Sequence, residues 1–266
     1  MNSHIDNLPP KLRKMIGECD WIPIDAPYSG ASTYLLKRQS NWNNYLKILP
    51  SPHHEPLHNA KERLEWLQQK LPVPKVLFYS HDGAREFLLT QEIEGIDCSD
   101  HAVWQENVAD LIQRFAIGLK MVHGVNIEDC PFDHRLTTRL QIAEHNMKSN
   151  LLDSAGIMNQ FPGSSVEELY HLLISEQSAM VEDLVFTHGD YSMPNVIIHT
   201  GEINGFIDLG NSGVADRYQD LAIAAKSIVR NYGEKWVPLF FEAYGIGEID
   251  HDKIRYYQLL EWFVFP

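Results

Sequence analysis

The chain has 266 residues, of which 44% are hydrophobic and 22% are charged. This composition is typical of a globular protein and excludes a disordered chain, and the length allows one large domain or two lobes with a substantial core. The formal net charge of −14 would repel nucleic acid and anionic membranes, so we expect neither as a partner, whereas a polycationic molecule would be attracted.

No part of the sequence predicts a disulfide framework, a zinc site or a membrane segment. The three cysteines, Cys19, Cys98 and Cys130, lie far apart and form no CxxC pair. The N-terminal segment lacks the apolar stretch of a signal peptide, and no apolar run approaches the roughly 18 residues that a membrane span needs. We therefore expect a cytoplasmic protein.

The first third of the chain predicts β-strands around one helix. Short runs of apolar and β-branched residues, separated by turn-forming residues, are typical of strands. They cover residues 33–36, 45–49, 76–79 and 87–90. Residues 59–70 predict a helix with Leu64 and Leu67 facing inward, and Pro72 ends it.

After residue 100 the pattern changes to long helices. Apolar residues recur at three- and four-residue spacing between Val108 and Val122, which predicts an amphipathic helix ending at Gly124. Ser165 and Glu168 have the spacing of a capping box, which predicts the start of another helix.

Short apolar strands interrupt these helices before the chain becomes helical again. The strands are predicted at residues 184–187, 196–198 and 205–207, and the last helical stretch at residues 219–265. The sequence thus predicts an α+β protein of two lobes. The β-rich N-lobe would comprise residues 1–93 and the mainly helical C-lobe residues 94–266.

The strongest chemical signal is the segment HGDYSMPN at residues 188–195, followed by Asp208. Its polar groups fall where predicted strands meet loops. Asp190 can accept a proton from a hydroxyl, and the side-chain oxygens of Asn195 and Asp208 are the ligand type that Mg²⁺ prefers. HGD alone is a turn tripeptide, but phosphoryl transfer needs both an orienting group and a clamp on the phosphates, and the whole set supplies both.

The sequence resembles the aminoglycoside 3′-phosphotransferases, within the protein-kinase-like superfamily, over nearly its whole length. The matching segments are residues 29–31, 45–47, 66–67, 71–76, 188–195, 205–210 and 215–220. The resemblance implies a bilobal protein-kinase-like fold and transfer of the γ-phosphoryl group of ATP to a hydroxyl of an aminoglycoside antibiotic. Two alternatives stay open: a kinase of another small amino-sugar or alcohol metabolite, and a nucleotide-binding module with little catalysis.

The resemblance also implies a role for each matching residue in phosphoryl transfer. Asp190 matches the catalytic aspartate that faces the acceptor hydroxyl, and Asn195 and Asp208 match the Mg²⁺ ligands. We expect Asp216 and Asp220 to be structural acids that support the catalytic loop or cap the following helix.

The nucleotide-binding residues come from the N-terminal matches. Lys47 matches the lysine that holds the α- and β-phosphates of ATP, and Tyr45 matches the aromatic residue that stacks on adenine. The phosphate-covering loop matches Ser29 and Gly30, and the hinge whose backbone pairs with adenine matches the segment from Gln91 to Ile93. From the residues alone, a solvated lysine is the commoner interpretation of Lys47, and a core tyrosine is an equal alternative for Tyr45.

Two departures from the family concern the nucleotide side. The helix glutamate that normally pairs with the strand lysine is Ala60 here. Glu62 cannot replace it without a shift, because two residues along a helix correspond to a rotation of roughly 200°. An arginine that usually follows the glycine after Asp208 is replaced by Asn211. We therefore expect Lys47 to be less well oriented than in relatives.

A third departure concerns the acceptor side. Arg230 and Asn231 stand where relatives carry an acidic pair, and near the C-terminus Glu261 is followed by Trp262 in place of a second acid. We expect Glu261 to meet an ammonium group and Trp262 to stack on a sugar face or a cation. Fewer carboxylates imply weaker binding of a polycation.

Overall fold

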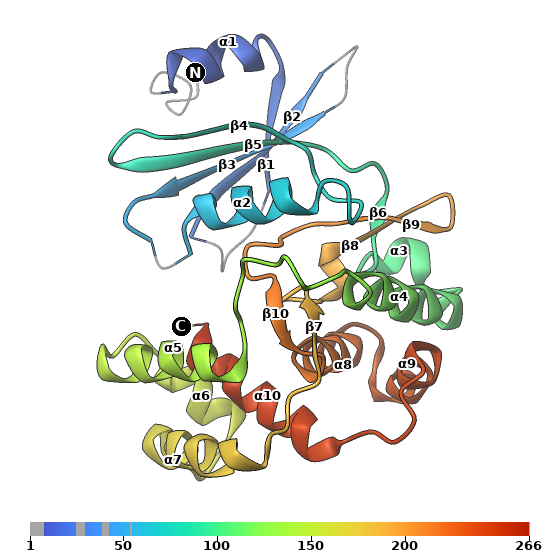
Figure 1. Cartoon of the computed structure of the whole chain (residues 1–266). Helices are drawn as coiled ribbons and strands as arrows, with labels where there is room; N and C mark the ends of the chain where they lie inside the picture. Colours follow the sequence, from blue (N-terminus) through green and yellow to red (C-terminus); the bar gives the residue numbers. More distant parts are fainter. Residues whose placement is uncertain (1–7, 25–29, 39–42, 54, 266) are drawn as a thin grey trace. The chain divides into compact units, whose positions relative to one another are not determined.

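The computed structural model describes residues 8–24, 30–38, 43–53 and 55–265, which form two compact units (Figure 1). The first unit contains the chain up to Ile96 together with Ile197–Asn211, and the second contains Asp97–Val196 and the residues from Ser212 onward. The first is rich in strands and the second in helices, which confirms the expected α+β class.

The first unit is built on a five-stranded antiparallel sheet with the strand order β1-β2-β3-β5-β4. The elements of the chain up to Gln91 are α1 (Pro10–Ile16), β1 (Asp20–Ile24), β2 (Ser32–Lys37), β3 (Asn44–Pro50), α2 (Leu57–Leu67), β4 (Val76–His81) and β5 (Arg85–Gln91). Helices α1 and α2 lie on opposite faces of this sheet (Figure 1). Leu12 of α1 packs with Leu46 on one face, and Leu57 of α2 packs with Leu49 on the other.

Strand β3 carries two of the candidate site residues on one face. Leu46 and Ile48 are buried in the cluster beneath α1. Because successive side chains of a strand point to opposite faces, Tyr45 and Lys47 point to the α2 face. Both are only partly buried.

A later segment of the chain returns to complete the first unit. Strands β6 (Ile96–Asp97), β8 (Val196–His199) and β9 (Glu202–Phe206) form a three-stranded sheet in the order β6-β8-β9. The Phe206 N–H donates to the Pro72 carbonyl at 2.9 Å, and Asn204 Nδ2 donates to the Glu94 carbonyl at 2.6 Å. The expected division at residue 93 had assigned this segment to the C-lobe, whereas these contacts hold it in the first unit.

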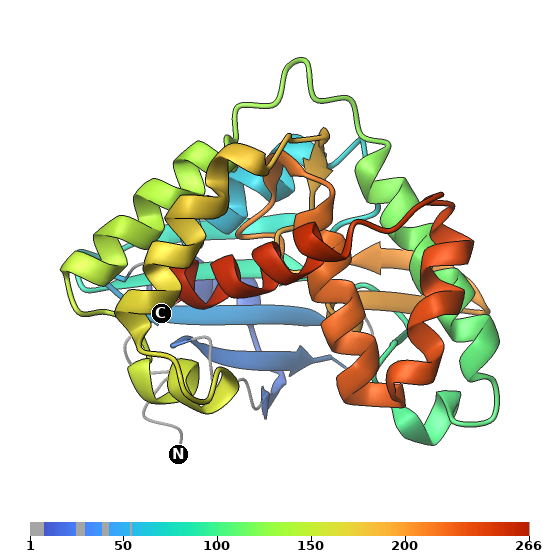
Figure 2. The same ribbon diagram turned by 90° about the horizontal axis from the view of Figure 1, so that it is seen from below.

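The second unit consists mainly of helices around a two-stranded sheet of β7 and β10. Its elements are α3 (His101–Trp104), α4 (Val108–His123), α5 (Leu136–Lys148), α6 (Ser154–Gln160), α7 (Val166–Glu176), η1 (Gln177–Ala179), β7 (Leu184–Thr187), η2 (Met193–Asn195), β10 (Gly213–Asp216), α8 (Tyr218–Tyr232), η3 (Glu234–Trp236), α9 (Val237–Tyr244) and α10 (His251–Val264). Helix α10 packs against α5, α7 and α8 (Figure 2).

The ends of these helices follow local sequence signals. The predicted capping box is confirmed at the start of α7, where Ser165 and Glu168 bond reciprocally. The stretch expected to be helical over residues 219–265 is divided by Gly233 and Gly245, which adopt positive φ angles of +95° and +78°. Glycine accepts this backbone region readily, so both residues end a helix. No helix in the described ranges is long and apolar enough to cross a membrane.

Candidate active site

The HGD loop, which we define as residues 188–195, connects β7 to β8 and presents Asp190. Asn195 fixes the conformation of this loop through its side-chain amide nitrogen. Asn195 Nδ2 donates to Asp190 Oδ2 at 2.8 Å, to the Asp190 carbonyl at 3.0 Å and to Ser192 Oγ at 3.1 Å. The Asp190 carboxylate is thereby held in one orientation, with its side chain only partly buried.

Side chains of helix α8 anchor the HGD loop through hydrogen bonds to its backbone. The Asp220 carboxylate, which is fully buried, accepts hydrogen bonds from the His188 N–H at 2.6 Å and the Gly189 N–H at 2.9 Å. About two turns further along α8, Ser227 Oγ accepts from the Met193 N–H at 2.9 Å. A buried carboxylate needs such donors to offset its desolvation, so the anchor and the loop stabilise each other. The expected supporting role of Asp220 is visible in these bonds.

Asp216 has the other supporting role that the sequence suggested. Its buried carboxylate accepts from the Tyr218 N–H at 2.8 Å in the first turn of α8, and from Lys253 Nζ at 2.6 Å. It therefore ties the start of α8 to α10.

Lys47 and Asp208 form an ion pair within the first unit. Lys47 lies on β3 and Asp208 follows β9, so the returning segment brings together two residues that are 161 positions apart. Asp208 has a φ of +61°. A residue with a side chain costs on the order of 1–3 kcal/mol in that region, and such strain is concentrated at functional sites.

The oxygens of Asn195 and Asp208 suit a hard divalent cation. Because Asn195 directs its amide nitrogen at Asp190, its Oδ1 receives no hydrogen bond from any described residue. Asp208 supplies a carboxylate that is 52% exposed. Amide and carboxylate oxygens are the ligands that Mg²⁺ takes in phosphoryl-transfer sites, together with phosphate oxygens and water. Each of the two side chains therefore carries an oxygen of the type that Mg²⁺ accepts.

The helix that carries Ala60 supplies no carboxylate to Lys47. Ala60 packs against the cluster of Leu49, Leu57 and Leu88 between α2 and the sheet. Glu62 is exposed and pairs with His58 Nε2 at 3.1 Å, as its position on the helix predicts. The carboxylate that Lys47 contacts is that of Asp208 instead.

Asn211, the other departure on this side, also has a defined contact. Its Nδ2 donates to Glu55 Oε1 at 2.9 Å, just ahead of α2. A neutral amide here forms one hydrogen bond where an arginine would form a charge-assisted pair.

The remaining nucleotide-side candidates lie on or beside the sheet of the first unit. Tyr45 shares the α2 face of β3 with Lys47. Gly30 precedes β2 with a φ of +61°, a backbone region that favours glycine, and a Cβ at this position would lie 2.6 Å from the His53 side chain at Nε2. Ser29 lies outside the described residues.

The hinge segment uses one of its two candidate N–H groups internally. The Gln91 N–H donates to the Lys75 carbonyl at 2.9 Å. The Ile93 N–H donates to no described backbone oxygen. We therefore expect Ile93 rather than Gln91 to supply the donor to adenine.

Asp190 lines a cavity of about 350 Å³ in the second unit. We call this cavity the Asp190 cavity. It is lined by Asp190, Ser192, Pro194, Ile223, Lys226, Ser227, Arg230, Asn231 and Glu261. The structure thus brings Asp190 together with Glu261, Arg230 and Asn231, which the sequence placed on the acceptor side. Two cationic and two anionic side chains line this cavity, so its formal charges balance.

Lys226 forms an ion pair with Glu261, the carboxylate that we expected to bind an ammonium group of the acceptor. Its Nζ lies 3.1 Å from Glu261 Oε2 and 5.2 Å from the centroid of the Trp262 ring. Both Glu261 and Trp262 therefore already contact a cation from α8. Sequence reasoning missed Lys226, whose position among alanines on α8 gives no sign of a partner 35 residues away.

Known proteins match this chain along almost its whole length. A profile of the phosphotransferase enzyme family matches residues 21–257. An aminoglycoside 3′-phosphotransferase of Niallia circulans is 39% identical over 264 residues, which cover 99% of this chain and 100% of that relative.

Solved structures agree with this match. The crystal structure of an aminoglycoside 3′-phosphotransferase of type VIII has a TM-score of 0.85 and 28% identity, covering 98% of this chain and 100% of the other. An aminoglycoside phosphotransferase of Streptomyces rimosus, solved in complex with ADP and streptomycin, has a TM-score of 0.79 and 25% identity over 96% of each chain.

Proposed function

The chain belongs to the phosphotransferase enzyme family, and from this premise we propose that it transfers the γ-phosphoryl group of ATP to a hydroxyl of an aminoglycoside and so confers resistance to that antibiotic. The observation that carries the proposal is the Asp190 carboxylate, which is clamped by Asn195 at the edge of the Asp190 cavity. A fixed carboxylate that faces a cavity can orient a hydroxyl and accept its proton.

Asp190 is the residue to which we assign the acceptor hydroxyl. As the oxygen–phosphorus bond forms, the hydroxyl proton passes to an Asp190 carboxylate oxygen, and ADP leaves with the electrons of the broken bond. The clamp from Asn195 and the anchor from Asp220 keep the carboxylate in place, so no reorganisation is needed during the reaction.

The first unit is assigned to the nucleotide. Lys47 would contact the α- and β-phosphates, Tyr45 would stack on the adenine, and the Ile93 N–H would donate to it. Gly30 would let the backbone approach the phosphates, because glycine has no side chain and accepts the positive φ of +61°. ADP in the Streptomyces rimosus relative supports ATP as the co-substrate.

Asn195 and Asp208 would hold Mg²⁺ through their side-chain oxygens. When bound, the ion neutralises charge on the phosphate oxygens. Lys47 pairs with Asp208, so the lysine that we assign to the phosphates would also orient this carboxylate.

The acceptor class follows from the relatives and from charge. The relatives are named for the 3′ position of aminoglycosides, so we assign the 3′-hydroxyl as the acceptor. Glu261 can take one ammonium group of the antibiotic, and the net charge of −14 attracts a polycation over a longer range. Lys226 and Arg230 oppose close binding of further ammonium groups, which favours a smaller or less charged alcohol as the second candidate.

An acceptor panel tests the proposal. The chain is incubated with Mg·ATP and kanamycin, neomycin, an uncharged hexose or a choline-like alcohol, and mass spectrometry measures the phosphorylated product. We expect product with kanamycin and neomycin, and binding that weakens as salt is added. Efficient turnover of the hexose or the alcohol without any antibiotic product would replace the aminoglycoside as acceptor. Absence of turnover with every acceptor would favour a nucleotide-binding module.

A further inference from the structure

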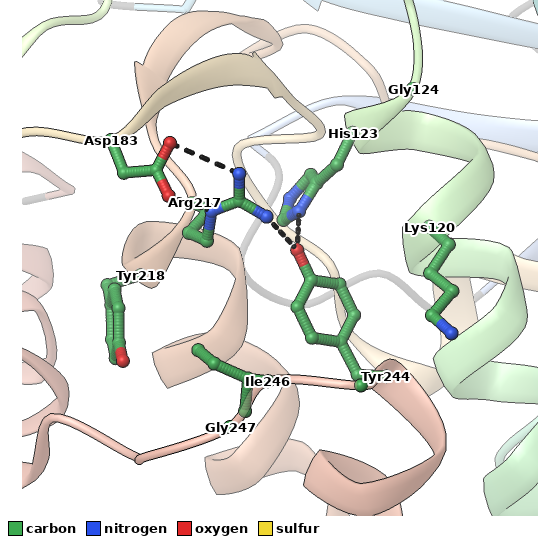
Figure 3. Close-up of a pocket in the computed structure, with 10 residues that line it drawn as sticks. Lys120, His123, Gly124, Asp183, Arg217, Tyr218, Tyr244, Ile246 and Gly247 are labelled. Carbon is green, nitrogen blue, oxygen red and sulfur yellow. Dashed lines mark hydrogen bonds and ion pairs between the residues drawn. The ribbon is translucent and has the colours of Figure 1, made fainter.

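A second cavity of about 560 Å³ lies in the second unit, and its polar wall leads to the HGD loop. Figure 3 shows the residues of this Tyr244 cavity, which include Lys120 and His123 from α4, Asp183 ahead of β7, Arg217 ahead of α8, and Tyr244 at the end of α9. Asp190 does not line it. None of these residues has a role in the function proposed above.

Four side chains of this wall form a continuous series of hydrogen bonds. Asp183 accepts from Arg217 Nε and from Arg217 Nη2 at 3.1 Å, and Arg217 Nη1 reaches the Tyr244 hydroxyl at 2.8 Å (Figure 3). The same hydroxyl lies 2.7 Å from His123 Nδ1.

The series ends on the anchor of the HGD loop. His123 Nε2 lies 3.2 Å from Asp220 Oδ2. That oxygen also accepts the His188 N–H. His123 and Asp220 are both buried, with side-chain exposures of 4% and 0%.

The guanidinium and the carboxylates fix the direction of the bonds at the two ends of this series. A guanidinium can only donate and an ionised carboxylate can only accept. Tyr244 therefore accepts from Arg217, and His123 Nε2 carries the proton that bonds Asp220. In the neutral imidazole, Nδ1 then accepts the proton of the Tyr244 hydroxyl. Burial raises the pKa of the Tyr244 phenol, and the bond to Asp183 raises the pKa of Arg217, so each keeps the proton that it must donate.

We infer that His123 is a positioning residue for Asp190, and that Tyr244 and Arg217 select the tautomer in which it acts. The Nε2–H of His123 is the side-chain donor to Asp220, whose other bonds are to the N–H groups of the HGD loop. With this donor in place, Asp220 stays oriented toward His188 and Gly189, and Asp190 follows directly in the chain. The inference rests on the proposed function in that it takes Asp190 as the group that receives the acceptor proton.

Two substitutions of His123 distinguish the loss of its hydrogen bond to Asp220 from the loss of the imidazole ring itself. The amide nitrogen of glutamine reaches the place of Nε2 and can still donate to Asp220, whereas the amide of asparagine reaches only the place of Nδ1. We expect His123→Asn to lower kcat roughly ten- to a hundredfold, the range for a displaced catalytic group, and to leave the KM for ATP unchanged. His123→Gln should restore most of kcat. Lys120→Gln, which changes an exposed side chain of the same cavity, is the matched control and should leave kcat unchanged.

Amide hydrogen exchange over residues 186–192 gives a readout that needs no acceptor. We expect faster exchange in His123→Asn than in His123→Gln or Lys120→Gln. Should His123→Asn fail to fold, Tyr244→Phe keeps the ring that packs against Phe240 and removes only the hydroxyl, and it should show the same change in exchange.

Two results would overturn the inference. One is an equal loss of kcat in His123→Asn and His123→Gln, and the other is unchanged exchange over the HGD loop with only a lower melting temperature. If the wild-type chain phosphorylates no aminoglycoside but the exchange pattern holds, the proposed function fails and the positioning of the loop stands.

Discussion

Replacing Lys226 with methionine is expected to strengthen the binding of a polycationic acceptor. Methionine keeps much of the aliphatic length of lysine and its contact with the Trp262 ring, but it removes the charge beside Glu261. The carboxylate would then be free for an ammonium group of the antibiotic.

The size of the effect follows from the exposure of the pair. Lys226 is 42% exposed and Glu261 24% exposed, and a pair of this kind contributes about 0–1 kcal/mol to stability. The fold therefore loses little. A positive charge about 4 Å from an incoming ammonium costs about 1 kcal/mol in water and about 4 kcal/mol near a protein surface. In an open cavity we take about 1–2 kcal/mol, which corresponds to a decrease of about 5- to 30-fold in the KM for kanamycin.

Steady-state kinetics with kanamycin as the varied substrate measures this change. The KM for ATP should stay constant, and the gain should shrink with added salt because screening weakens the repulsion that was removed. Lys235→Met is the matched control, since Lys235 Nζ also lies 5.2 Å from a tryptophan ring centroid, that of Trp236, but does not line the Asp190 cavity. An increased KM for kanamycin in Lys226→Met would refute the reasoning, because it would mean that Lys226 holds Glu261 ready for the substrate.

Three further predictions concern the phosphoryl-transfer residues. Asp190→Asn should keep nucleotide binding, measured by calorimetry, and lower kcat by roughly 10²–10⁴, the range for a lost general base; a near-normal kcat would remove its role. Asp208→Ala should abolish turnover while circular dichroism shows an intact fold, and wild-type activity should disappear with excess chelator; full turnover in chelator would show that no divalent cation is needed. Lys47→Ala should raise the KM for ATP or lower kcat, and Ala60→Glu should improve catalysis if a second carboxylate orients the lysine better than Asp208 alone. Unchanged ATP kinetics in Lys47→Ala would make Lys47 an ordinary surface lysine.

Local patterns were enough to predict the elements that carry the site. The alternation along β3 places Tyr45 and Lys47 on one face, because side chains of a strand alternate regardless of the rest of the fold. The capping box at Ser165 and the apolar spacing of α4 depend on neighbours within a few residues. The structure therefore has these features as the sequence predicted them.

Contacts between distant segments could not be predicted in this way. The return of Ile197–Asn211 to the first unit depends on bonds to Pro72 and Glu94, which a strand pattern does not reveal. The partner of Lys47 is another example. Sequence reasoning expected a poorly oriented lysine from the missing glutamate at Ala60, whereas the returning segment supplies Asp208.

Polar side chains on helices were the hardest to assign. Lys226 on α8 and His123 at the end of α4 have no motif spacing, and a lone lysine or histidine on a helix is most often solvated or part of the core. Their partners, Glu261 and Asp220, come from other helices. Only helix packing reveals that one lies at the acceptor carboxylate and the other at the anchor of the HGD loop.

The most direct measurement of the proposed chemistry compares two acceptors that differ in one oxygen. Kanamycin B and its 3′-deoxy analogue carry the same ammonium groups, so both should bind, but only the first has the hydroxyl assigned to Asp190. With the wild-type chain and Mg·ATP, the account predicts one phosphoryl group on kanamycin B and none on the 3′-deoxy compound, and with Asp190→Asn a rate on kanamycin B that is lower by roughly 10²–10⁴. Equal phosphorylation of the two compounds, or undiminished product with Asp190→Asn, would contradict it.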